Sequence, residues 1–350
     1  MNTVRRARTS TPVPVTIVSG FLGAGKTTLL NRILNGDHGL KIAVMVNDFG
    51  AINIDSQLVV SANQKTISLA NGCICCTVEN DLIEQLQTLL LKGDERPEHI
   101  LIEASGVSDP SKIVNTLRYP RLRSHLNIDA VITLVDAEQF SDLEGEMKTL
   151  AMNQLSIADI IVLNKTDCVD EQQITALSEQ WFFPSARVIK TQFAQVPLEI
   201  LLGLKGGRNT EPALSLCNLQ NLSCDAPSHH KTHAKQFSSF SWESSQPLSL
   251  NHLRQVLKRL PAHLYRAKGF VYLQEAPEHQ CVVQLVGSRL EISKGDKWHK
   301  PPSSELVFIA WQTVNPENVR MQLEGCVESP SKGLPRVPAP TGIPFDQARR

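Results

Sequence analysis

The sequence predicts an α/β fold, in which helices cover both faces of a mostly parallel sheet, followed by a smaller C-terminal α+β domain. Three observations support this prediction. Short β-branched runs alternate with helical segments in the first part of the chain. A glycine-rich loop lies between the first predicted strand and the first predicted helix. A stretch rich in Gly, Asn, Ser and Pro then precedes a second unit of helices and strands.

The glycine-rich loop, GFLGAGKTT at residues 20–28, follows an apolar run at residues 13–18 and precedes a helical stretch. It matches the GxxxxGK[ST] phosphate loop in its required context, so a chance glycine-rich turn is the weaker alternative. Backbone N–H groups and the helix N-terminus favour bound phosphate. Lys26 would reach the β- and γ-phosphates, and the Thr27 hydroxyl would ligate Mg²⁺. The expected nucleotide-binding residues here are Gly20, Gly23, Ala24, Gly25, Lys26, Thr27 and Thr28.

The rest of the first domain continues the alternation. Buried strands are predicted at residues 41–46, 99–102, 130–135 and 160–163. Helices are predicted at residues 81–91, 110–117, 146–157 and 171–181. Ligands of parallel sheets bind beyond the carboxyl ends of the strands, and the polar motifs follow several of these strands directly.

The motif Asn164-Lys165-Thr166-Asp167 follows one of these strands and matches the guanine-reading NKxD pattern. The Asp167 carboxylate would accept the N1–H and 2-amino groups of guanine, which adenine lacks. Asn164 and Lys165 would support the loop and cover the base. The alternative is that Asn164 or Asp167 merely caps a helix. The position of the motif at a strand end, after a phosphate loop, favours the guanine site.

Two further segments carry carboxylates at strand ends. Glu103 ends a buried strand, where an acidic residue helps to hold Mg²⁺, and Gly106 would offer its N–H to a γ-phosphate. We therefore expect catalytic roles for Lys26, Thr27 and Glu103. Asp48 and Asp55 follow another strand, and each would contact Mg²⁺, position water or bind a second metal, or belong to an ordinary surface loop.

The segment Gly72-Cys73-Ile74-Cys75-Cys76 holds three thiols in four residues. Three deprotonated thiols converging on one soft cation predict a Zn²⁺ site with an open fourth position. Candidates for a fourth protein ligand are Asp48, Asp55 and His125. A redox thiol pair or inert buried cysteines are the alternatives to metal binding.

Composition limits the function classes. Lys plus Arg and Asp plus Glu both number 35 and aromatic residues are scarce, which argues against nucleic-acid binding. No apolar run approaches the length of a membrane span. Nucleotide use and clustered thiols favour a cytoplasmic protein, because the cysteine spacing does not resemble a secreted disulfide framework.

The expected organisation is five segments. Arg5, Arg6 and Arg8 before the apolar run at 13–22 superficially resemble a signal peptide, but that run leads into the phosphate loop, so residues 1–11 are expected to form a disordered basic arm, and a transit peptide is left open. Residues 12–204 form the nucleotide-binding domain, 205–235 a linker, 236–326 the α+β domain and 327–350 a disordered Pro-rich tail. The second domain is expected to hold strands at 237–242, 269–274, 281–286 and 305–311, with helices at 250–260 and 316–323. The linker contains a short tract of three histidines, 229–233, which is either a metal-loading segment or solvated chain.

Together these motifs resemble the CobW-like family of P-loop GTPases, the metallochaperone branch of the metal-insertion GTPases. The resemblance covers GFLGAGKTT, VNDFG (46–50), Asp55, NGCICC (71–76), EASGVSDP (103–110), NKTD, LYRAKG (264–269) and ELVFI (305–309). It implies a GTPase domain plus a small αβ domain, and GTP-dependent delivery of metal from Cys73, Cys75 and Cys76 to client apoproteins. Asp48 stands where relatives usually carry Glu.

The resulting hypothesis is a GTP-hydrolysing zinc metallochaperone with Zn²⁺ and Mg²⁺ as cofactors and GTP, GDP and a client apo-metalloprotein as partners. A homodimer is left open. Alternatives are insertion of cobalt or another metal into a cobalamin-like or nitrile-hydratase-like client, a zinc-sensing module without chaperone turnover, and a kinase, for which no substrate motif is present.

Overall fold

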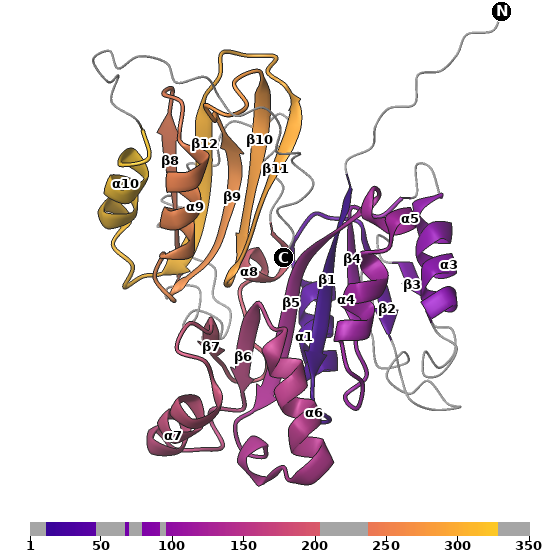
Figure 1. Ribbon diagram of the computed structural model, residues 1–350. Coiled ribbons are helices and arrows are strands. Elements are labelled where there is room, and N and C mark those ends of the chain that lie inside the picture. The colour runs from indigo at the N-terminus through magenta and orange to yellow at the C-terminus, as the bar shows by residue number, and fades with distance from the viewer. Residues whose placement is uncertain (1–11, 47–66, 70–78, 92–95, 204–236, 328–350) are drawn as a thin grey trace, which may run out of the picture.

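The part of the chain that the structure describes forms two β-sheets, each with its own helices (Figure 1). The computed structural model describes residues 12–46, 67–69, 79–91, 96–203 and 237–327. Among the helices in these ranges, none combines the length and the apolar character that a bilayer crossing requires.

The first sheet has seven strands in the order β3-β2-β4-β1-β5-β6-β7. Every neighbouring pair is parallel. The strands are β1 Val13–Gly20, β2 Ile42–Val46, β3 Ile67–Leu69, β4 His99–Glu103, β5 Leu126–Asp136, β6 Ile160–Asn164 and β7 Val188–Lys190. Nearly all residues of β1, β2, β4, β5 and β6 are buried, which explains why these segments are almost continuously apolar.

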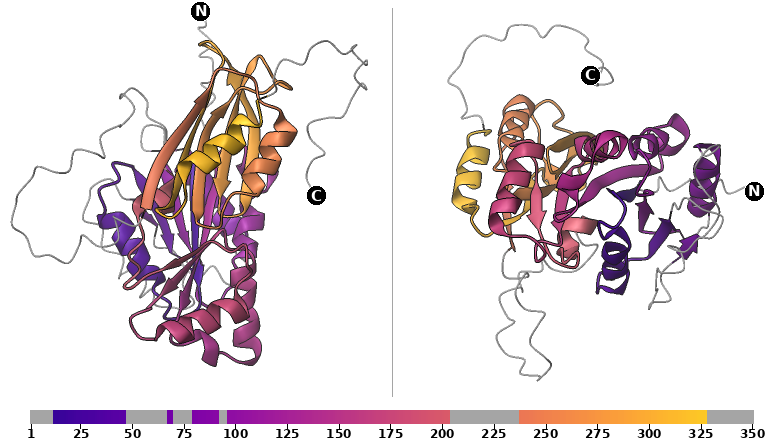
Figure 2. Two further views of the ribbon diagram at one scale, coloured as in Figure 1. Left: turned by 90° about the vertical axis from the view of Figure 1, so that its left-hand side faces the viewer. Right: turned by 90° about the horizontal axis from the view of Figure 1, so that it is seen from below.

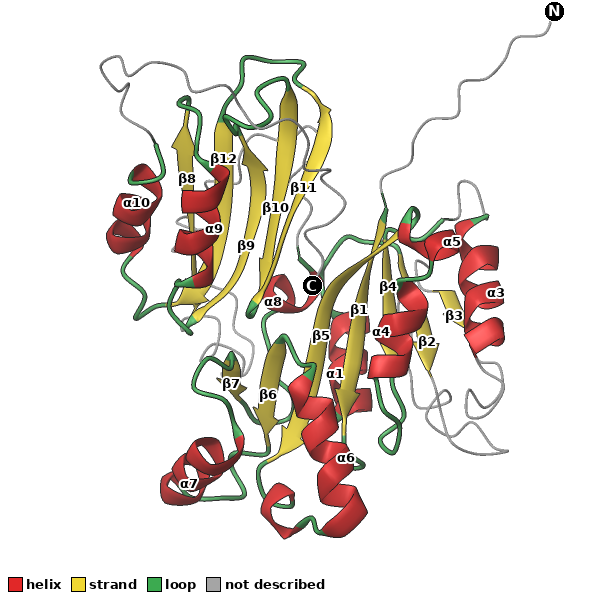
Figure 3. Ribbon diagram, viewed as in Figure 1, coloured by secondary structure: helices red, strands yellow, loops and turns green. Residues whose placement is uncertain are grey.

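Helices cover both faces of this sheet, as Figure 3 shows with α4 and α6 in front and α1 behind. Alternate residues of one strand face opposite layers: Ile132 of β5 belongs to the core layer of α1 and α8, whereas Val131 belongs to the layer of α3, α4 and α5. One face carries α1 Lys26–Asn35 and α8 Leu198–Leu202. The other carries α3 Glu79–Leu90, α4 Ser111–Leu117, α5 Pro120–Arg123, α6 Gly145–Ser156 and α7 Glu171–Trp181.

The second sheet has five antiparallel strands in the order β11-β10-β9-β12-β8. The strands are β8 Phe237–Ser244, β9 Leu264–Val271, β10 His279–Val286, β11 Arg289–Lys297 and β12 Ser304–Trp311. Helices α9 Leu250–Lys258 and α10 Pro316–Glu324 pack on one face, and both lie in front of the sheet in the left view of Figure 2. The predicted fold class, a parallel α/β sheet followed by a smaller α+β unit, is confirmed.

The structure also contains elements that the sequence did not predict. Strand β11 lies at the edge of the second sheet and is mostly exposed. Its many charged residues obscure the alternation of apolar and polar residues that would predict a strand. Strand β9 begins at Leu264, five residues before the predicted start. In contrast, α7 spans the predicted residues because Asp170 and Gln173 form a reciprocal capping box at its N-terminus.

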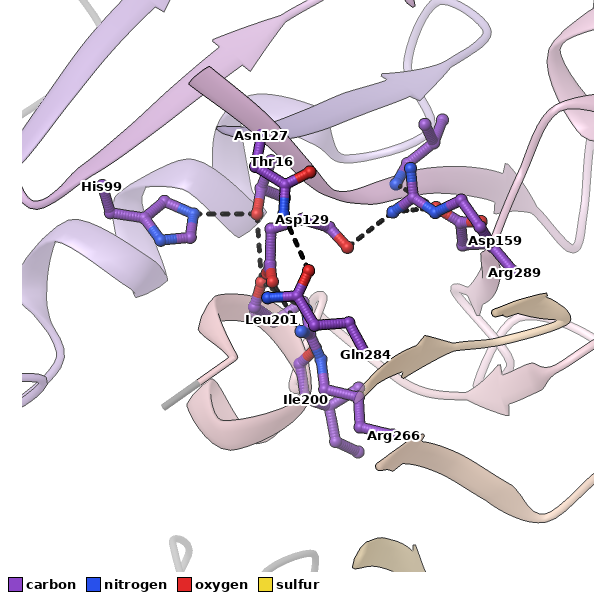
Figure 4. A network of polar contacts seen from close by, with 11 residues as sticks. Thr16, His99, Asn127, Asp129, Asp159, Ile200, Leu201, Arg266, Gln284 and Arg289 are labelled. Carbon is purple, nitrogen blue, oxygen red and sulfur yellow. Dashed lines mark hydrogen bonds and ion pairs between the residues drawn. The ribbon is translucent and has the colours of Figure 1, made fainter. Parts of the chain in front are cut away.

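A buried ion pair joins the two sheets (Figure 4). Arg266 of β9 donates to the carboxylate of Asp129 of β5 at 2.9 Å, and both side chains are almost fully buried. The same guanidinium donates to the carbonyl oxygens of Ile200 and Leu201 at the end of α8. Burial by itself raises the pKa of Asp129, but the positive charges around it, Arg266 first, hold that pKa below its ordinary value.

A second arginine extends this network. Arg289 at the start of β11 forms an ion pair with Asp159 at 2.9 Å and donates to the backbone carbonyl of Asp129 at 2.6 Å. Asp159 also accepts the N–H of Val131 at 2.7 Å. Burial nevertheless raises the pKa of Asp159 to about 6, because Arg289 and this N–H only partly offset the loss of hydration.

We predict that Asp129→Asn and Arg266→Met each lower the free energy of unfolding by about 3 kcal/mol, because each leaves a buried charge without its partner. The double variant should lose clearly less than the sum of the two single losses. Urea unfolding of the four proteins measures this coupling, and strictly additive losses would contradict it.

We also predict that lowering the pH from about 7 to about 4 stabilises the wild type relative to Asp159→Asn. The folded carboxyl binds its proton near pH 6 and the unfolded one near 3.8, so the stabilisation is complete below the unfolded pKa and lost as the pH rises through the folded pKa. The full difference is roughly 3 kcal/mol. Denaturation midpoints across this range measure it, and a pH-independent difference would rule it out.

Candidate functional site

Because all strands of the first sheet run in one direction, Gly20 of β1, Glu103 of β4 and Asn164 of β6 end at the same edge. Between β1 and α1, the glycine-rich loop curls over this edge. Gly25 adopts a left-handed φ of 103° at the N-cap of α1, and an added Cβ would lie 2.5 Å from Nδ2 of Asn164. The first turn of α1 carries no acidic residue, so its N-terminus favours an anion.

Lys26 is directed back over the same loop. Its side chain is mostly buried, and Nζ donates to the carbonyl oxygen of Phe21 at 3.1 Å. This hydrogen bond holds the ammonium group beside the first part of the loop. A phosphate group cradled by the loop would therefore meet both backbone N–H groups and a positive charge. Thr28, the last residue of the motif, lies in the first turn of α1 and is exposed.

Thr27 and Glu103 bring two oxygen ligands together. The Thr27 hydroxyl donates to the Glu103 carboxylate at 3.4 Å, and Glu103 is only 2% exposed. Hydroxyl and carboxylate oxygens suit Mg²⁺, which prefers oxygen ligands. The two side chains therefore fit a magnesium site beside the phosphate loop.

Asn164 links the candidate base-reading loop, residues 164–167, to the glycine-rich loop. Its Nδ2 donates to the carbonyl oxygen of Ala24 at 2.9 Å, and its Oδ1 accepts the N–H of Ala194 at 2.8 Å. Both contacts are buried, so the amide orientation is fixed by its two partners. Ala194 adopts a left-handed φ of 54°, which a non-glycine residue holds only when its surroundings enforce it.

Lys165 is held by an acidic residue that sequence reasoning missed. Asp136, the last residue of β5, pairs with Lys165 Nζ at 2.6 Å and accepts the N–H of Glu138 at 3.0 Å. The hydrogen bond to Asp136 is the main reason that the pKa of Lys165 is raised. Asp167, the expected guanine acceptor, is exposed at the same loop. Among the described residues, the structure thus brings phosphate-binding, magnesium-binding and base-reading candidates to one edge.

Asp136 was detectable, because it directly follows the strand predicted at 130–135, as Glu103 and Asn164 directly follow theirs. No sequence signal marked Ala194, since its role depends on a backbone N–H and on a left-handed φ. These features arise from tertiary structure.

The metal-ligand candidates Asp48, Asp55, Cys73, Cys75 and Cys76 lie outside the described residues, as does the histidine tract. His125 precedes β5 and so lies at the opposite edge of the sheet from Glu103 and Asn164. Within the described ranges, no group of three or more His, Cys, Asp or Glu residues is arranged to hold a metal ion.

Comparison with known proteins identifies two matching families. The CobW/HypB/UreG nucleotide-binding domain matches residues 14–183, and the cobalamin synthesis protein CobW C-terminal domain matches residues 237–327. The zinc chaperone YjiA of Escherichia coli K12 is 33% identical, over 90% of this chain and 98% of that protein. The zinc-regulated GTPase metalloprotein activator 1 of Dictyostelium discoideum is 29% identical, over 90% of this chain and 80% of that protein. The crystal structure of Zn(II)-bound YjiA GTPase from E. coli aligns with 91% of this chain and 100% of that chain, at 28% identity and a TM-score of 0.41.

We predict that Asn164→Asp weakens binding of guanosine nucleotides by roughly tenfold or more, because a carboxylate cannot donate to Ala24 and the lost hydrogen bond is buried. Binding of a fluorescent GDP derivative measures the effect. The same change at Asn153, an exposed residue of α6, is the matched control and should leave affinity unaltered. Equal affinities of both variants and the wild type would disprove the bridging role of Asn164.

Proposed function

The chain belongs to the CobW/HypB/UreG family of nucleotide-binding proteins, and from this premise we propose that it is a GTPase that controls a zinc ion held by Cys73, Cys75 and Cys76 and delivers it to client apoproteins. One observation carries the nucleotide half of this proposal. Asn164 is hydrogen-bonded to both the phosphate loop and the segment at Ala194, so the parts that would hold the phosphates and the base form one connected site.

Each described residue at the edge then has a task. The loop amides and Lys26 would bind the phosphates, and Asp167 would accept the two guanine donors. Asp136 keeps Lys165 in place beside the base. Thr27 and Glu103 would hold Mg²⁺, which neutralises charge on the phosphate oxygens when bound. We expect slow hydrolysis without a client, because the sequence motifs assign no glutamine to position water and no arginine finger.

The zinc half of the proposal is supported by chain connectivity and by the relatives. Strand β3 ends at Leu69, four residues before Cys73 in the sequence, and because it runs parallel to β2 its carboxyl end lies at the edge that carries Glu103. Relatives at about 30% identity include the zinc chaperone YjiA and the zinc-regulated GTPase metalloprotein activator 1. Three thiolates suit Zn²⁺ better than they suit hard cations, and a free fourth position allows release.

We predict that the apparent affinity for Zn²⁺ differs by about tenfold between the protein loaded with Mg²⁺ and a non-hydrolysable GTP analogue and the protein loaded with GDP. Competition titration with a zinc chelator measures both affinities, and the matching ATP analogue serves as the nucleotide control. Equal affinity in both guanine states would refute the coupling, because a ligand without preference shifts no equilibrium.

The same titration, repeated on cysteine variants, tests whether Cys73, Cys75 and Cys76 hold the zinc ion. The Cys73/Cys75/Cys76→Ser triple variant should lose tight Zn²⁺ binding but keep guanine nucleotide binding, whereas Cys217→Ser should keep both. Retained zinc in the triple variant would place the metal elsewhere.

A further inference from the structure

Helix α6 presents one buried polar side chain to the loop that follows β4. Gln154 is 1% exposed, and its Nε2 donates to the carbonyl oxygens of Gly106 at 3.2 Å and Ser108 at 3.1 Å. Because both partners are carbonyls, the side-chain amide must direct its nitrogen, and not its oxygen, toward the loop. One NH₂ group thus holds two points of the loop.

Gln154 is itself held from behind. The Thr133 hydroxyl of β5 donates to the backbone carbonyl of Gln154 at 3.1 Å, and its neighbours Ala151 and Leu155 are buried in the core against Val135. The helix therefore cannot shift toward or away from the sheet without breaking this packing. Gln154 therefore holds the loop from a fixed position on α6.

The opposite side of the loop rests on the phosphate loop. A Cβ added at Gly106 would lie 2.7 Å from Cδ2 of Leu22 and 2.9 Å from its backbone nitrogen, so only glycine fits this approach. Within the loop, Ser108 N–H donates to the carbonyl oxygen of Ser105 at 3.0 Å. The loop that begins at Glu103 is thus clamped between α6 and the phosphate loop.

This clamp sets the direction of the loop amides. In a trans peptide the C=O and the following N–H point in opposite directions, so turning the Gly106 carbonyl toward Gln154 turns the Val107 N–H away from α6. That N–H has a long contact of 3.5 Å with the Ser105 hydroxyl, which a stronger acceptor would displace. The γ-phosphate oxygens would be such an acceptor.

We propose that Gln154 is a positioning residue that pre-forms the loop at 103–108 for the γ-phosphate, and so makes the protein discriminate GTP from GDP. This inference rests on the proposed function. When the loop is already ordered, GTP does not bear the entropy cost of ordering it. GDP has no γ-phosphate to contact the amides around Gly106, where Gln154 holds the loop, so its binding should not depend on Gln154.

The test uses Gln154→Met, which keeps the side-chain volume and removes the donors, with Gln154→Ala as a second variant. Affinities for fluorescent GTPγS and GDP are measured with Mg²⁺. We expect GTPγS binding to weaken by roughly tenfold in both variants, as the loss of two hydrogen bonds suggests, with GDP affinity unchanged. Asn153→Ala, one residue away on the exposed side of α6, should match the wild type for both nucleotides.

The outcomes separate the two claims. Equal weakening for GTPγS and GDP would assign Gln154 a merely structural role and overturn the inference, and so would unchanged affinity for both. GDP binding also reports whether each variant is folded. If the wild type bound neither guanine nucleotide, the proposed function would fail first. If the wild type bound both and only the variants failed to change the ratio, the inference alone would fail.

Discussion

The common direction of the seven strands in the first sheet is the constraint on which the site depends. Parallel pairing places the carboxyl ends of β1, β4, β5 and β6 at one edge, so that residues far apart in sequence become neighbours. Thr27 meets Glu103, and Lys165 meets Asp136, only because each pair flanks strands that run the same way. Parallel strands can be neighbours because helices connect the end of one strand to the start of the next, and these helices also bury both faces of the sheet.

The site is built from loops, and each loop is held by hydrogen bonds from side chains of neighbouring elements. Asp136 restrains Lys165, Asn164 restrains the phosphate loop and the backbone at Ala194, and Gln154 restrains the loop at Gly106. Each restraint is a hydrogen bond made largely out of water, where leaving a polar group unpaired costs more than in solvent. Pre-ordering of this kind lowers the entropy cost of binding a ligand.

The contact between the two sheets depends on a buried ion pair. Arg266 and Asp129 are both removed from water, and their charges are tolerated because the guanidinium also satisfies two carbonyls at the end of α8. Helix α8 follows the Ala194 segment directly, so the residue that Asn164 contacts and the carbonyls that Arg266 contacts lie on one short stretch of chain. This stretch of chain and its hydrogen bonds therefore connect the second sheet to the edge of the first sheet at which Asn164 lies.

The sequence by itself determined the fold class, because apolar runs and caps such as that of α7 act locally, and it also determined the family through motifs of fixed spacing. It marked the loop at Gly20 to Thr28, Glu103 and Asn164 to Asp167 as candidates, because these residues stand directly at strand ends. Only the tertiary structure decided the pairings of Asp136, Gln154, Arg266 and the edge strand β11. Those contacts join residues distant in sequence, and a polar residue in a helix or strand carries no local signal of the partner that burial will give it.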